Sequence, residues 1–262
     1  MIDTHCHILP GMDDGPRSMD AALRMAASAV RDGIQTIIAT PHHTTKRYNN
    51  TARKIQRRVG LFNGKLKKHN IPLRILPGQE YRLTDSFRAE HRARRLQTLA
   101  GSSYLLVELP SRMIPGCLYE FFTYMKHHGI HPVIAHPERN LEIIDNPDQV
   151  LDWIENYGVR LQVTTQSLIG VFGRNVQETA SYLCRKHWIH LVGSDAHNLS
   201  LRNFHFQEGY EAIKQLCGSS YMKILQEHAA KLIYGSTMTS LHHQQSGIES
   251  ICRDDEITSP NT

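Results

Sequence analysis

Short apolar runs alternate with longer stretches of helical periodicity along residues 1–234. The seven runs are rich in Val, Ile and Leu, have the length of buried strands, and end in polar side chains. Alternation of strand and helix is typical of a parallel sheet, so we expect an α/β fold. In chain order the runs are MIDTH, IQTIIATPHH, LRILPGQE, SYLLVELPS, IHPVIAHPER, VRLQVTTQS and IHLVGSDAH.

Two of the intervening stretches carry signals for both ends of a helix. Ser18 is a typical N-cap for SMDAALRMAASAVRDG, and Gly33 would end that helix. Asn146 and Pro147 would begin a second helix in NPDQVLDWIENYG. Gly158 would end it.

No repeat or long linker interrupts residues 1–234, so we expect them to form one domain. If the sheet closes into a barrel, the polar run ends meet at one rim, where barrel enzymes carry their active sites. From 235 to 262 the sequence is polar and lacks a sustained period, which predicts a flexible tail that includes His242 and His243.

The overall composition is that of an ordinary globular protein, since 40% of the 262 residues are hydrophobic and 21% are charged. No apolar stretch approaches the roughly 20 residues that cross a bilayer, so no membrane insertion is expected. Asp3, His5 and His7 interrupt the first residues, where a secretory signal would be apolar. We therefore expect a cytoplasmic protein.

The net charge of +5 is unevenly distributed along the chain. Residues 46–95 hold 15 Lys or Arg against three acidic residues, a balance of +12, whereas the remaining residues balance at −7. Such a region can steer an anionic partner, although solvated helices also carry charge without any partner. A nucleic-acid-binding module is one interpretation. The region lacks the interleaved aromatic residues of a stacking platform, so no nucleic-acid partner is expected.

The five cysteines argue against two kinds of site. They form no CxxC pair, as a structural zinc site would, and their odd number does not suit a disulfide framework. A cysteine-dependent phosphatase would need Cys, five residues and then Arg, and none of the five fits this pattern. The cysteines are Cys6, Cys117, Cys184, Cys217 and Cys252.

His5 and His7 form a His-x-His pair, which on a strand presents two imidazoles to the same face. Asp195 and His197 repeat this spacing at the end of the seventh run. Other ligand-capable side chains emerge where further runs end, namely His42, Glu80, Glu108 and His136.

These eight side chains combine histidine with carboxylate, a donor set that suits catalytic Mn, Fe or Zn. Because eight ligands exceed the needs of one ion, we expect two or three ions with a bridging carboxylate. Such clusters serve the hydrolysis of phosphate esters. The sequence neighbours Cys6 and His43 should point away from the group.

Six motifs occur in order along the chain: DTHCHILPGMDDGP, TPHHTTKRYNN, PGQEYRL, VELPS, VIAHPERN and GSDAHN. Together they resemble the PHP (polymerase and histidinol phosphatase) superfamily. More closely, they resemble its bacterial manganese-dependent protein-tyrosine phosphatases, which are linked to capsular and exopolysaccharide synthesis. Over residues 1–234 the resemblance implies a distorted seven-stranded TIM-like (β/α) barrel with metals at the C-terminal rim. Mn²⁺ is the metal implied, and Fe, Zn, Co and Mg are alternatives.

Carried across by position, the resemblance implies three ligand sets. One ion would be held by His5, His7, Glu80 and Asp195. A second would be held by Glu80, Glu108 and His136. A third would be held by Asp14, His42 and His197.

Two assignments near these sets rest on position in the motifs. Asp13 is chemically as able to bind as Asp14, and only the resemblance favours the second aspartate of the DDG sequence. Arg139 matches an arginine that contacts the phosphate in relatives, and Arg202 would supply a second contact.

The activity implied is hydrolysis of phosphotyrosine by in-line attack of a metal-bridging hydroxide. A phenol, with a pKa of about 10, leaves more readily than an alkoxide, so a strong general acid is less necessary. The resemblance suggests a tyrosine-phosphorylated protein as partner, namely the C-terminal tail of a bacterial tyrosine kinase that controls capsule or exopolysaccharide synthesis. A small-molecule phosphatase similar to histidinol phosphatase is the alternative, and the nucleic-acid-binding module ranks lower.

Overall fold

A computed structural model describes residues 1–235, 237 and 238 of the chain. Apart from Gly235 and residues 237 and 238, the expected tail lies outside the described residues, His242 and His243 included. No helix of the described part is both long and apolar enough to cross a membrane.

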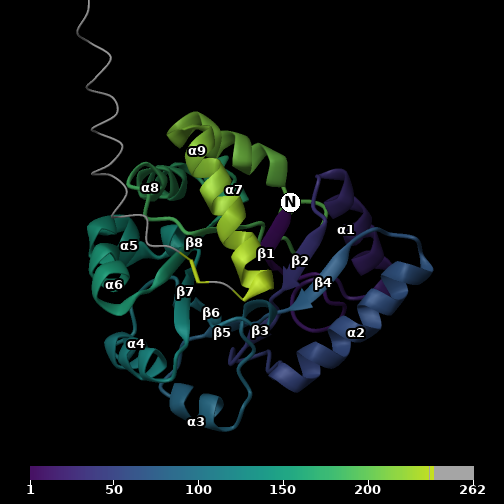
Figure 1. The fold of residues 1–262 in the computed structure, drawn as a ribbon, viewed down its shortest axis with the longest axis horizontal. Helices are drawn as coiled ribbons and strands as arrows, with labels where there is room; N and C mark the ends of the chain where they lie inside the picture. The colour runs from purple at the N-terminus through teal and green to yellow at the C-terminus, as the bar shows by residue number, and fades with distance from the viewer. Residues whose placement is uncertain (236, 239–262) are drawn as a thin grey trace, which may run out of the picture.

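Parallel strands form the centre of the molecule, with helices around them (Figure 1). One sheet has the order β1-β2-β4, and a second has the order β3-β5-β6-β7-β8-β9. The strands of the described residues are β1 (Ile2–Cys6), β2 (Thr36–Ala39), β3 (His42–His43), β4 (Arg74–Pro77), β5 (Glu80–Arg82), β6 (Tyr104–Glu108), β7 (His131–Ala135), β8 (Arg160–Thr164) and β9 (Leu191–Gly193). The predicted α/β class with a parallel sheet is confirmed.

The predicted count of seven strands is not confirmed, because two of the runs are each divided into two strands. The second run becomes β2 and β3 around Pro41, and the third becomes β4 and β5 around Pro77 and Gly78. Proline has no N–H to donate to a ladder, so the pairing of β2 with β4 stops at Ala39 and Pro77. Pairing resumes in the second sheet, where His42 lies opposite Glu80.

The first and last strands meet beside each other, although they are nearly two hundred residues apart in the sequence. Cys6 forms an isolated parallel bridge with Ala196. The Asp195 N–H donates to the His5 carbonyl at 2.8 Å, and the His7 N–H donates to the Ala196 carbonyl at 3.0 Å. These bonds connect the end of the second sheet to the first, and they bring the His-x-His pair next to the GSDAH segment.

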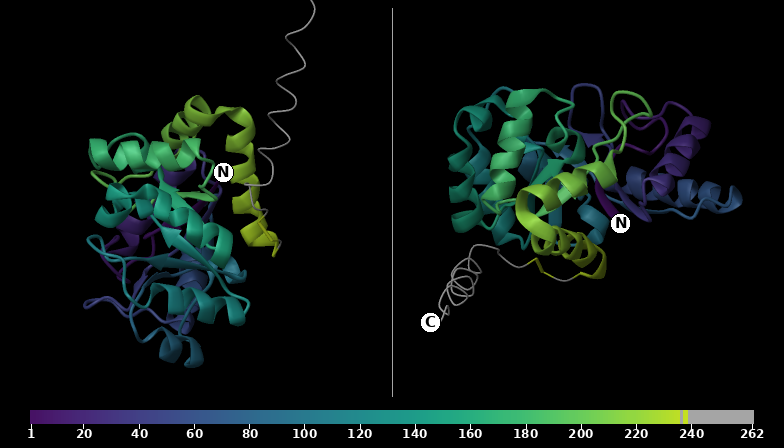
Figure 2. Two further views of the ribbon diagram at one scale, coloured as in Figure 1. Left: turned by 90° about the vertical axis from the view of Figure 1, so that its left-hand side faces the viewer. Right: turned by 90° about the horizontal axis from the view of Figure 1, so that it is seen from above.

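The helices lie outside the strands, with α1 and α2 on one side and α4 to α6 on the other (Figure 2). Their bounds are α1 (Met19–Arg31), α2 (Ala52–Lys68), α3 (Phe87–Arg92), α4 (Leu118–His127), α5 (Leu141–Asp145), α6 (Val150–Tyr157), α7 (Thr165–Leu168), α8 (Arg174–Arg185) and α9 (Phe206–Tyr234). Short 3-10 turns occur at Leu99–Gly101, Pro137–Arg139 and Pro147–Gln149. Gly218 has non-helical angles within α9 and divides it into two segments.

The predicted N-cap is present at the start of α1 but not at the start of the helix that contains α6. The Ser18 side chain accepts from the Ala21 N–H, as an N-cap does. Asn146 makes no such side-chain bond, and the second helix begins with the 3-10 turn before α6. Gly158 ends α6 in the left-handed conformation that glycine adopts readily.

The strands are buried on both faces, as expected for a parallel sheet covered by helices. In β6, Leu105 and Val107 belong to a large apolar cluster that includes residues of the outer helices. Leu106, on the opposite face, belongs to a second cluster with Ala229 and Leu232 of α9. Because side chains alternate along a strand, Glu108 at the end of β6 lies on the same face as Leu106.

We expect Gly209→Ala to destabilise the protein, because α9 approaches α7 closely at this glycine. A Cβ atom there would lie 2.6 Å from the Thr165 Cβ, and such overpacking reduces the free energy of unfolding by about 1–3 kcal/mol. Gly64→Ala is the matched control, since α2 has open space at that position. It should raise stability by about 0.5–1 kcal/mol through the helix preference for alanine. Urea unfolding of both variants tests the contact, and equal stabilities would contradict it.

Candidate metal centre

The nine side chains expected as metal ligands lie near the carboxyl-terminal ends of β1 and β6 or in the segments that follow β1, β2, β4, β7 and β9. His5 lies in β1 and His7 directly after it, while Asp195 and His197 follow β9. The other predicted ligands are His42 in β3, Glu80 in β5, Glu108 at the end of β6, His136 after β7, and Asp14 in the loop after β1. Parallel strands direct their carboxyl ends to the same edge, and this places the nine side chains in one region.

The first group consists of His5, His7, Glu80 and Asp195, all of them buried. The His7 Nε2 lies 3.2 Å from Glu80 Oε2 and 3.3 Å from Asp195 Oδ1. His5 Nε2 lies 3.5 Å and 3.3 Å from the same two oxygens. Ligand atoms that surround a metal at ordinary bond lengths lie about 3–3.5 Å from one another, so the spacing fits an ion at the centre.

Two further groups adjoin the first. His7, Asp14, His42 and His197 bring their ligand atoms together, with His197 Nε2 at 3.3 Å from Asp14 Oδ1. His42 also approaches Glu80 and Glu108, at 2.9 Å and 3.8 Å from the nearest oxygens. His7, His42 and Glu80 each belong to two of the groups, and the carboxylate of Glu80 has two oxygens with which to bridge ions.

His136 is placed beside Glu80 rather than within any of these groups of the described chain. Its Nε2 lies 2.8 Å from Glu80 Oε1, whereas Glu80 Oε2 faces the other histidines. The expected set of Glu80, Glu108 and His136 is therefore brought to one place, with His42 in addition.

Unsatisfied atoms inside the cluster support a cation as its missing partner. Among the described residues, Glu80 Oε2, Asp195 Oδ1 and His197 Nε2 are buried without a hydrogen-bond partner. Buried polar atoms are nearly always paired in native proteins, and an ion is one of the recognised explanations for an exception. The donor set of imidazoles and carboxylates fits divalent transition metals.

The two central carboxylates are ionised in spite of their burial. Burial alone would raise the pKa of Asp195, but Arg139 and the imidazoles around it hold that pKa well below its usual range. Burial opposes ionisation of Glu80 in the same way, and His42 and His5 lower its pKa well below normal. Burial lowers the pKa of His5, which favours the neutral imidazole that binds a metal.

Two residues of the cluster have a strained backbone. His136 has a φ of 34° and Asp195 a φ of 52°, in the left-handed region that non-glycine residues seldom adopt. His136 directly follows β7, and Asp195 is the second residue after β9, where the chain turns at the rim. Strain of this kind is typical of functional sites, where the surrounding structure holds a residue in a defined position.

The structure gives the two adjacent aspartates different positions. The Asp13 Oδ2 accepts a 2.7 Å bond from His7 Nδ1 and a 3.1 Å bond from the His42 backbone N–H. Asp14 instead directs Oδ1 toward His42 and His197. Asp13 therefore orients the His7 ring so that Nε2 faces the cluster, and Asp14 lies among the expected ligands.

Residues that the sequence did not indicate orient the rest of the first group. Gln162 Oε1 lies 2.8 Å from His5 Nδ1, which leaves Nε2 for the cluster. Asp3 accepts bonds from the Ser194 hydroxyl and N–H at 2.6 Å and 2.9 Å, next to Asp195. Asp3 stands two residues before His5, and polar residues at i, i+2 within an apolar run are the signal that could have revealed it.

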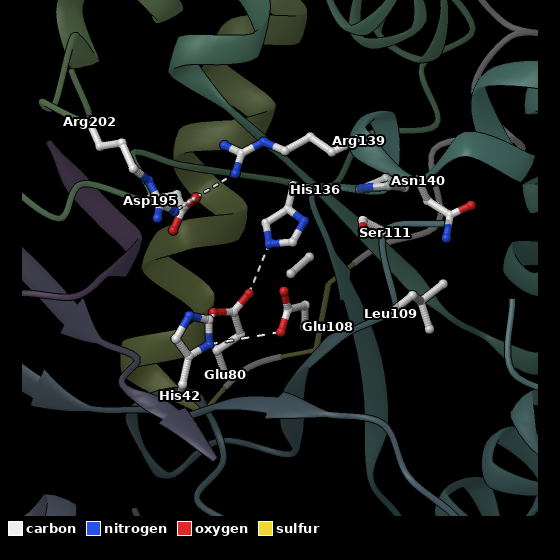
Figure 3. Close-up of a pocket in the computed structure, with 12 residues that line it drawn as sticks. His42, Glu80, Glu108, Leu109, Ser111, His136, Arg139, Asn140, Asp195 and Arg202 are labelled. Atoms are coloured by element: carbon white, nitrogen blue, oxygen red, sulfur yellow. Dashed lines mark hydrogen bonds and ion pairs between the residues drawn. The ribbon is translucent and has the colours of Figure 1, made fainter. Parts of the chain in front are cut away.

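The predicted phosphate contacts converge on Asp195 from above the cluster (Figure 3). Arg139 Nη1 and Arg202 Nη2 donate to Asp195 Oδ2 at 2.6 Å and 2.7 Å. They line a cavity of about 170 Å³ together with Glu80, Glu108 and other residues. Two guanidinium groups thus stand at one end of the cavity, and His42, Glu80 and Glu108 stand at the other.

Besides its bond to Asp195, Arg139 is held in place by two neighbours. Its Nη2 donates to the Thr164 hydroxyl at 2.7 Å, and its guanidinium lies 4.0 Å from the centre of the Phe172 ring. Glu138, which is fully buried, accepts from the Thr164 N–H at 3.1 Å and fixes that residue in turn. A guanidinium ordered in this way loses little side-chain entropy when it binds an anion.

The two residues expected to point away from the cluster do so. Cys6 is buried in the large apolar cluster, with its thiol 3.5 Å from the Ala196 carbonyl. His43 is also buried, and its Nε2 lies 3.0 Å from Glu90 Oε2.

Comparison with known proteins shows to which family the chain belongs. The sequence model of the CpsB/CapC family, described as capsular polysaccharide synthesis, matches residues 1–234. The chain belongs to the CpsB/CapC family. The resemblance drawn from the six motifs is therefore confirmed at the level of the family.

Relatives of this CpsB/CapC chain are named as phosphatases. It is 40% identical over 238 residues to the tyrosine-protein phosphatase YwqE of Bacillus subtilis, which covers 91% of this chain and 93% of YwqE. It is 28% identical to the tyrosine-protein phosphatase CpsB of Streptococcus pneumoniae, over 86% of this chain and 94% of the relative.

A solved structure agrees with these relatives in fold. It comes from crystal structures of YwqE from B. subtilis and CpsB from S. pneumoniae, described as metal-dependent tyrosine phosphatases. It matches this chain with a TM-score of 0.87 at 40% identity, over 91% of this chain and 96% of the other. The activity predicted from the motifs is the one that these relatives are named for.

We expect Asp13→Asn to weaken metal binding, because an amide cannot stabilise the His7 ring orientation as a carboxylate does. Loss of such an outer partner reduces metal affinity by about 10- to 100-fold. Asp20→Asn is the control, since Asp20 is an exposed residue of α1 that contacts Arg24 only through their surface ion pair. Titration of the metal-stripped proteins with Mn²⁺ by calorimetry measures the difference. Equal affinities of the two variants would contradict the role of Asp13.

Proposed function

We propose that this chain is a metal-dependent protein-tyrosine phosphatase that hydrolyses phosphotyrosine with two or three divalent ions, Mn²⁺ foremost. The observation that carries the proposal is a cluster of three adjoining ligand groups beside a cavity that Arg139 and Arg202 line. Membership of the CpsB/CapC family, with relatives named as tyrosine-protein phosphatases, supports the same activity.

Three sets of side chains would hold the ions. The first is His5, His7, Glu80 and Asp195, the second is Glu80, Glu108 and His136 with His42 nearby, and the third is Asp14, His42 and His197. Bound ions of this kind supply hydroxide at neutral pH and neutralise charge that develops on phosphate oxygens.

The arginines would orient the phosphate of the substrate. A guanidinium presents paired N–H donors in a geometry that matches phosphate oxygens. Arg139 and Arg202 approach Asp195 on Oδ2, while Asp195 Oδ1 faces His5 and His7. A phosphate bound by the arginines therefore lies next to the first ligand group, where donors stabilise the charge of the transition state.

The cavity also suits the leaving group. Leu109, Ala135 and Pro137 give part of its wall an apolar character that a phenyl ring can contact. Phenolate leaves with a conjugate acid pKa of about 10, so the reaction depends less on a strong general acid than that of an alkyl phosphate. This favours phosphotyrosine over histidinol phosphate as the substrate.

The partner we propose is a tyrosine-phosphorylated protein, namely the C-terminal tail of a bacterial tyrosine kinase involved in capsule or exopolysaccharide synthesis. The family description of capsular polysaccharide synthesis supports this setting. We further propose residues 1–234 as the phosphatase domain, the seven runs as the units of a distorted (β/α) barrel, and the cytoplasm as the place of action.

Removal and return of the metal tests the activity. Chelation should abolish hydrolysis of a phosphotyrosine peptide, and Mn²⁺ should restore it, because the cavity residues need the ions to activate water. Elemental analysis of the purified protein accompanies the assay. Histidinol phosphate and single-stranded DNA, assayed alongside, should be turned over far more slowly. Faster turnover of either would favour the corresponding alternative function.

Two variants test the ligand assignment within this experiment. His136→Ala and Asp195→Asn should each reduce kcat/KM for an aryl phosphate by at least about 100-fold, since even outer partners of metal ligands contribute about 10- to 100-fold. Circular dichroism should show that both remain folded. Full activity of either folded variant would refute its role.

Ionic strength should affect kcat/KM for a large peptide substrate more than kcat/KM for a small one. The loop after β3 and the start of α2 carry exposed cations, including Lys46, Arg47, Arg53 and Arg57. If they steer an acidic phosphotyrosine peptide, its kcat/KM falls as salt rises, because the Debye length shortens from about 10 Å at 0.1 M to about 3 Å at 1 M. A small aryl phosphate should change less. The same salt dependence for both substrates would remove the steering role.

A further inference from the structure

A second cavity, of about 500 Å³, opens beside the metal centre. His42 and Glu108 line both cavities, so a substrate bound in the first can extend directly into the second. The second cavity is lined mainly by the loop after β3 and the end of β5, with Asp14, His42 and Glu108 of the metal centre at its edge. The residues of the two segments are Thr44, Thr45, Lys46, Arg47, Tyr48, Arg82, Leu83 and Thr84.

Two of the cations in this cavity are uncompensated. Arg82 is paired, since its Nη1 lies 2.9 Å from Glu108 Oε1 and also donates to the Leu109 carbonyl. Lys46 and Arg47 are exposed, and no ion pair within 4.0 Å links either to a carboxylate of the described chain. Asp14, the remaining acid of the lining, faces His42 and His197 instead.

The loop that carries these cations is anchored to the protein. The Thr44 hydroxyl donates to the Arg82 carbonyl at 2.7 Å. The Tyr48 N–H donates to the Thr45 hydroxyl at 2.9 Å, and the Thr45 N–H donates to the Tyr48 carbonyl at 3.2 Å. The Tyr48 ring is nearly parallel to His42, with centres 6.1 Å apart. Lys46 and Arg47 therefore stand in a short closed turn next to a metal-centre residue.

We propose that this cavity binds an acidic side chain of the substrate, one to three residues from the phosphotyrosine, through Lys46 and Arg47. The inference rests on the proposed phosphatase function and narrows its substrate class to phosphotyrosine peptides with neighbouring Asp or Glu. An extended peptide advances about 3.3 Å per residue, so a flanking side chain reaches an adjoining cavity while the phosphate occupies the first.

This local contact differs from steering by the basic region as a whole. Steering depends on the summed field and acts on the rate of association, whichever cation supplies the charge. A contact depends on two particular side chains and acts on the affinity for one particular group of the peptide. Charge changes at matched positions distinguish the two effects.

The experiment compares two phosphotyrosine peptides that differ only in Glu or Gln at the flanking positions. The wild-type protein should prefer the Glu peptide by about three- to tenfold in kcat/KM, mostly through KM, which is the effect of two exposed ion pairs. Lys46→Gln with Arg47→Gln should remove this preference. Arg53→Gln with Arg57→Gln, the same charge change on exposed positions of α2 outside the cavity, should retain it.

The other outcomes overturn the proposal. Equal loss of preference in both double variants would show a long-range charge effect, and an absence of preference in the wild type would show that the cavity does not recognise acidic side chains. Hydrolysis of a small aryl phosphate should be the same in all variants. If that hydrolysis is absent altogether, the proposed function fails, and anisotropy measurements with non-hydrolysable phosphonate peptides still decide the binding comparison.

Discussion

The burial of two ionised carboxylates in one place is the constraint on which the site depends. Glu80 and Asp195 are almost fully buried, and two like charges without compensation would be strongly unfavourable there. Imidazoles surround Glu80 and guanidinium groups reach Asp195, and both carboxylates keep their charge. Each carboxylate has one oxygen toward the histidines that lacks a hydrogen-bond donor. Oxygens left in this state have the negative charge and the free lone pairs that a cation requires.

The fold produces this arrangement by joining β1, at one end of the first sheet, to the segment after β9, at one end of the second sheet. The bonds between β1 and the segment after β9 bring His5 and His7 to Asp195, and Asp3 connects to Ser194 across the same contact. The chain also breaks between β2 and β3, which carries His42 into the second sheet opposite Glu80. The places where the two sheets meet or a strand is interrupted are thus the parts that assemble the centre. The loop after β3 then extends the metal centre into a second cavity.

Much of this arrangement could be predicted from local patterns. The apolar runs mark the strands, and the ligand-capable residues at their ends are those that the structure brings together. The division of two runs at Pro41 and Pro77 was not anticipated, because a short break in an apolar run resembles a continuous strand until its pairing is known. Gln162 and Asp3 were missed for a related reason. A polar residue within a strand acquires a role only through a partner far away in the sequence.

The sequence by itself determined the alternation of strands and helices, the positions of nine ligand-capable side chains, and the family. The alternation and eight of these positions follow from periodicity and spacing, which are local properties of the chain, whereas Asp14 and the family follow from the resemblance of the six motifs to a known family. Only the tertiary structure gave the adjacent aspartates different neighbours, since Asp13 bonds to His7 while Asp14 faces His42 and His197. It also decided which cations of the basic region stand beside the centre. The direction in which a side chain points, and the side chains that lie near it, depend on contacts between segments that are distant in the sequence. The spacing of residues along the chain does not encode these contacts directly.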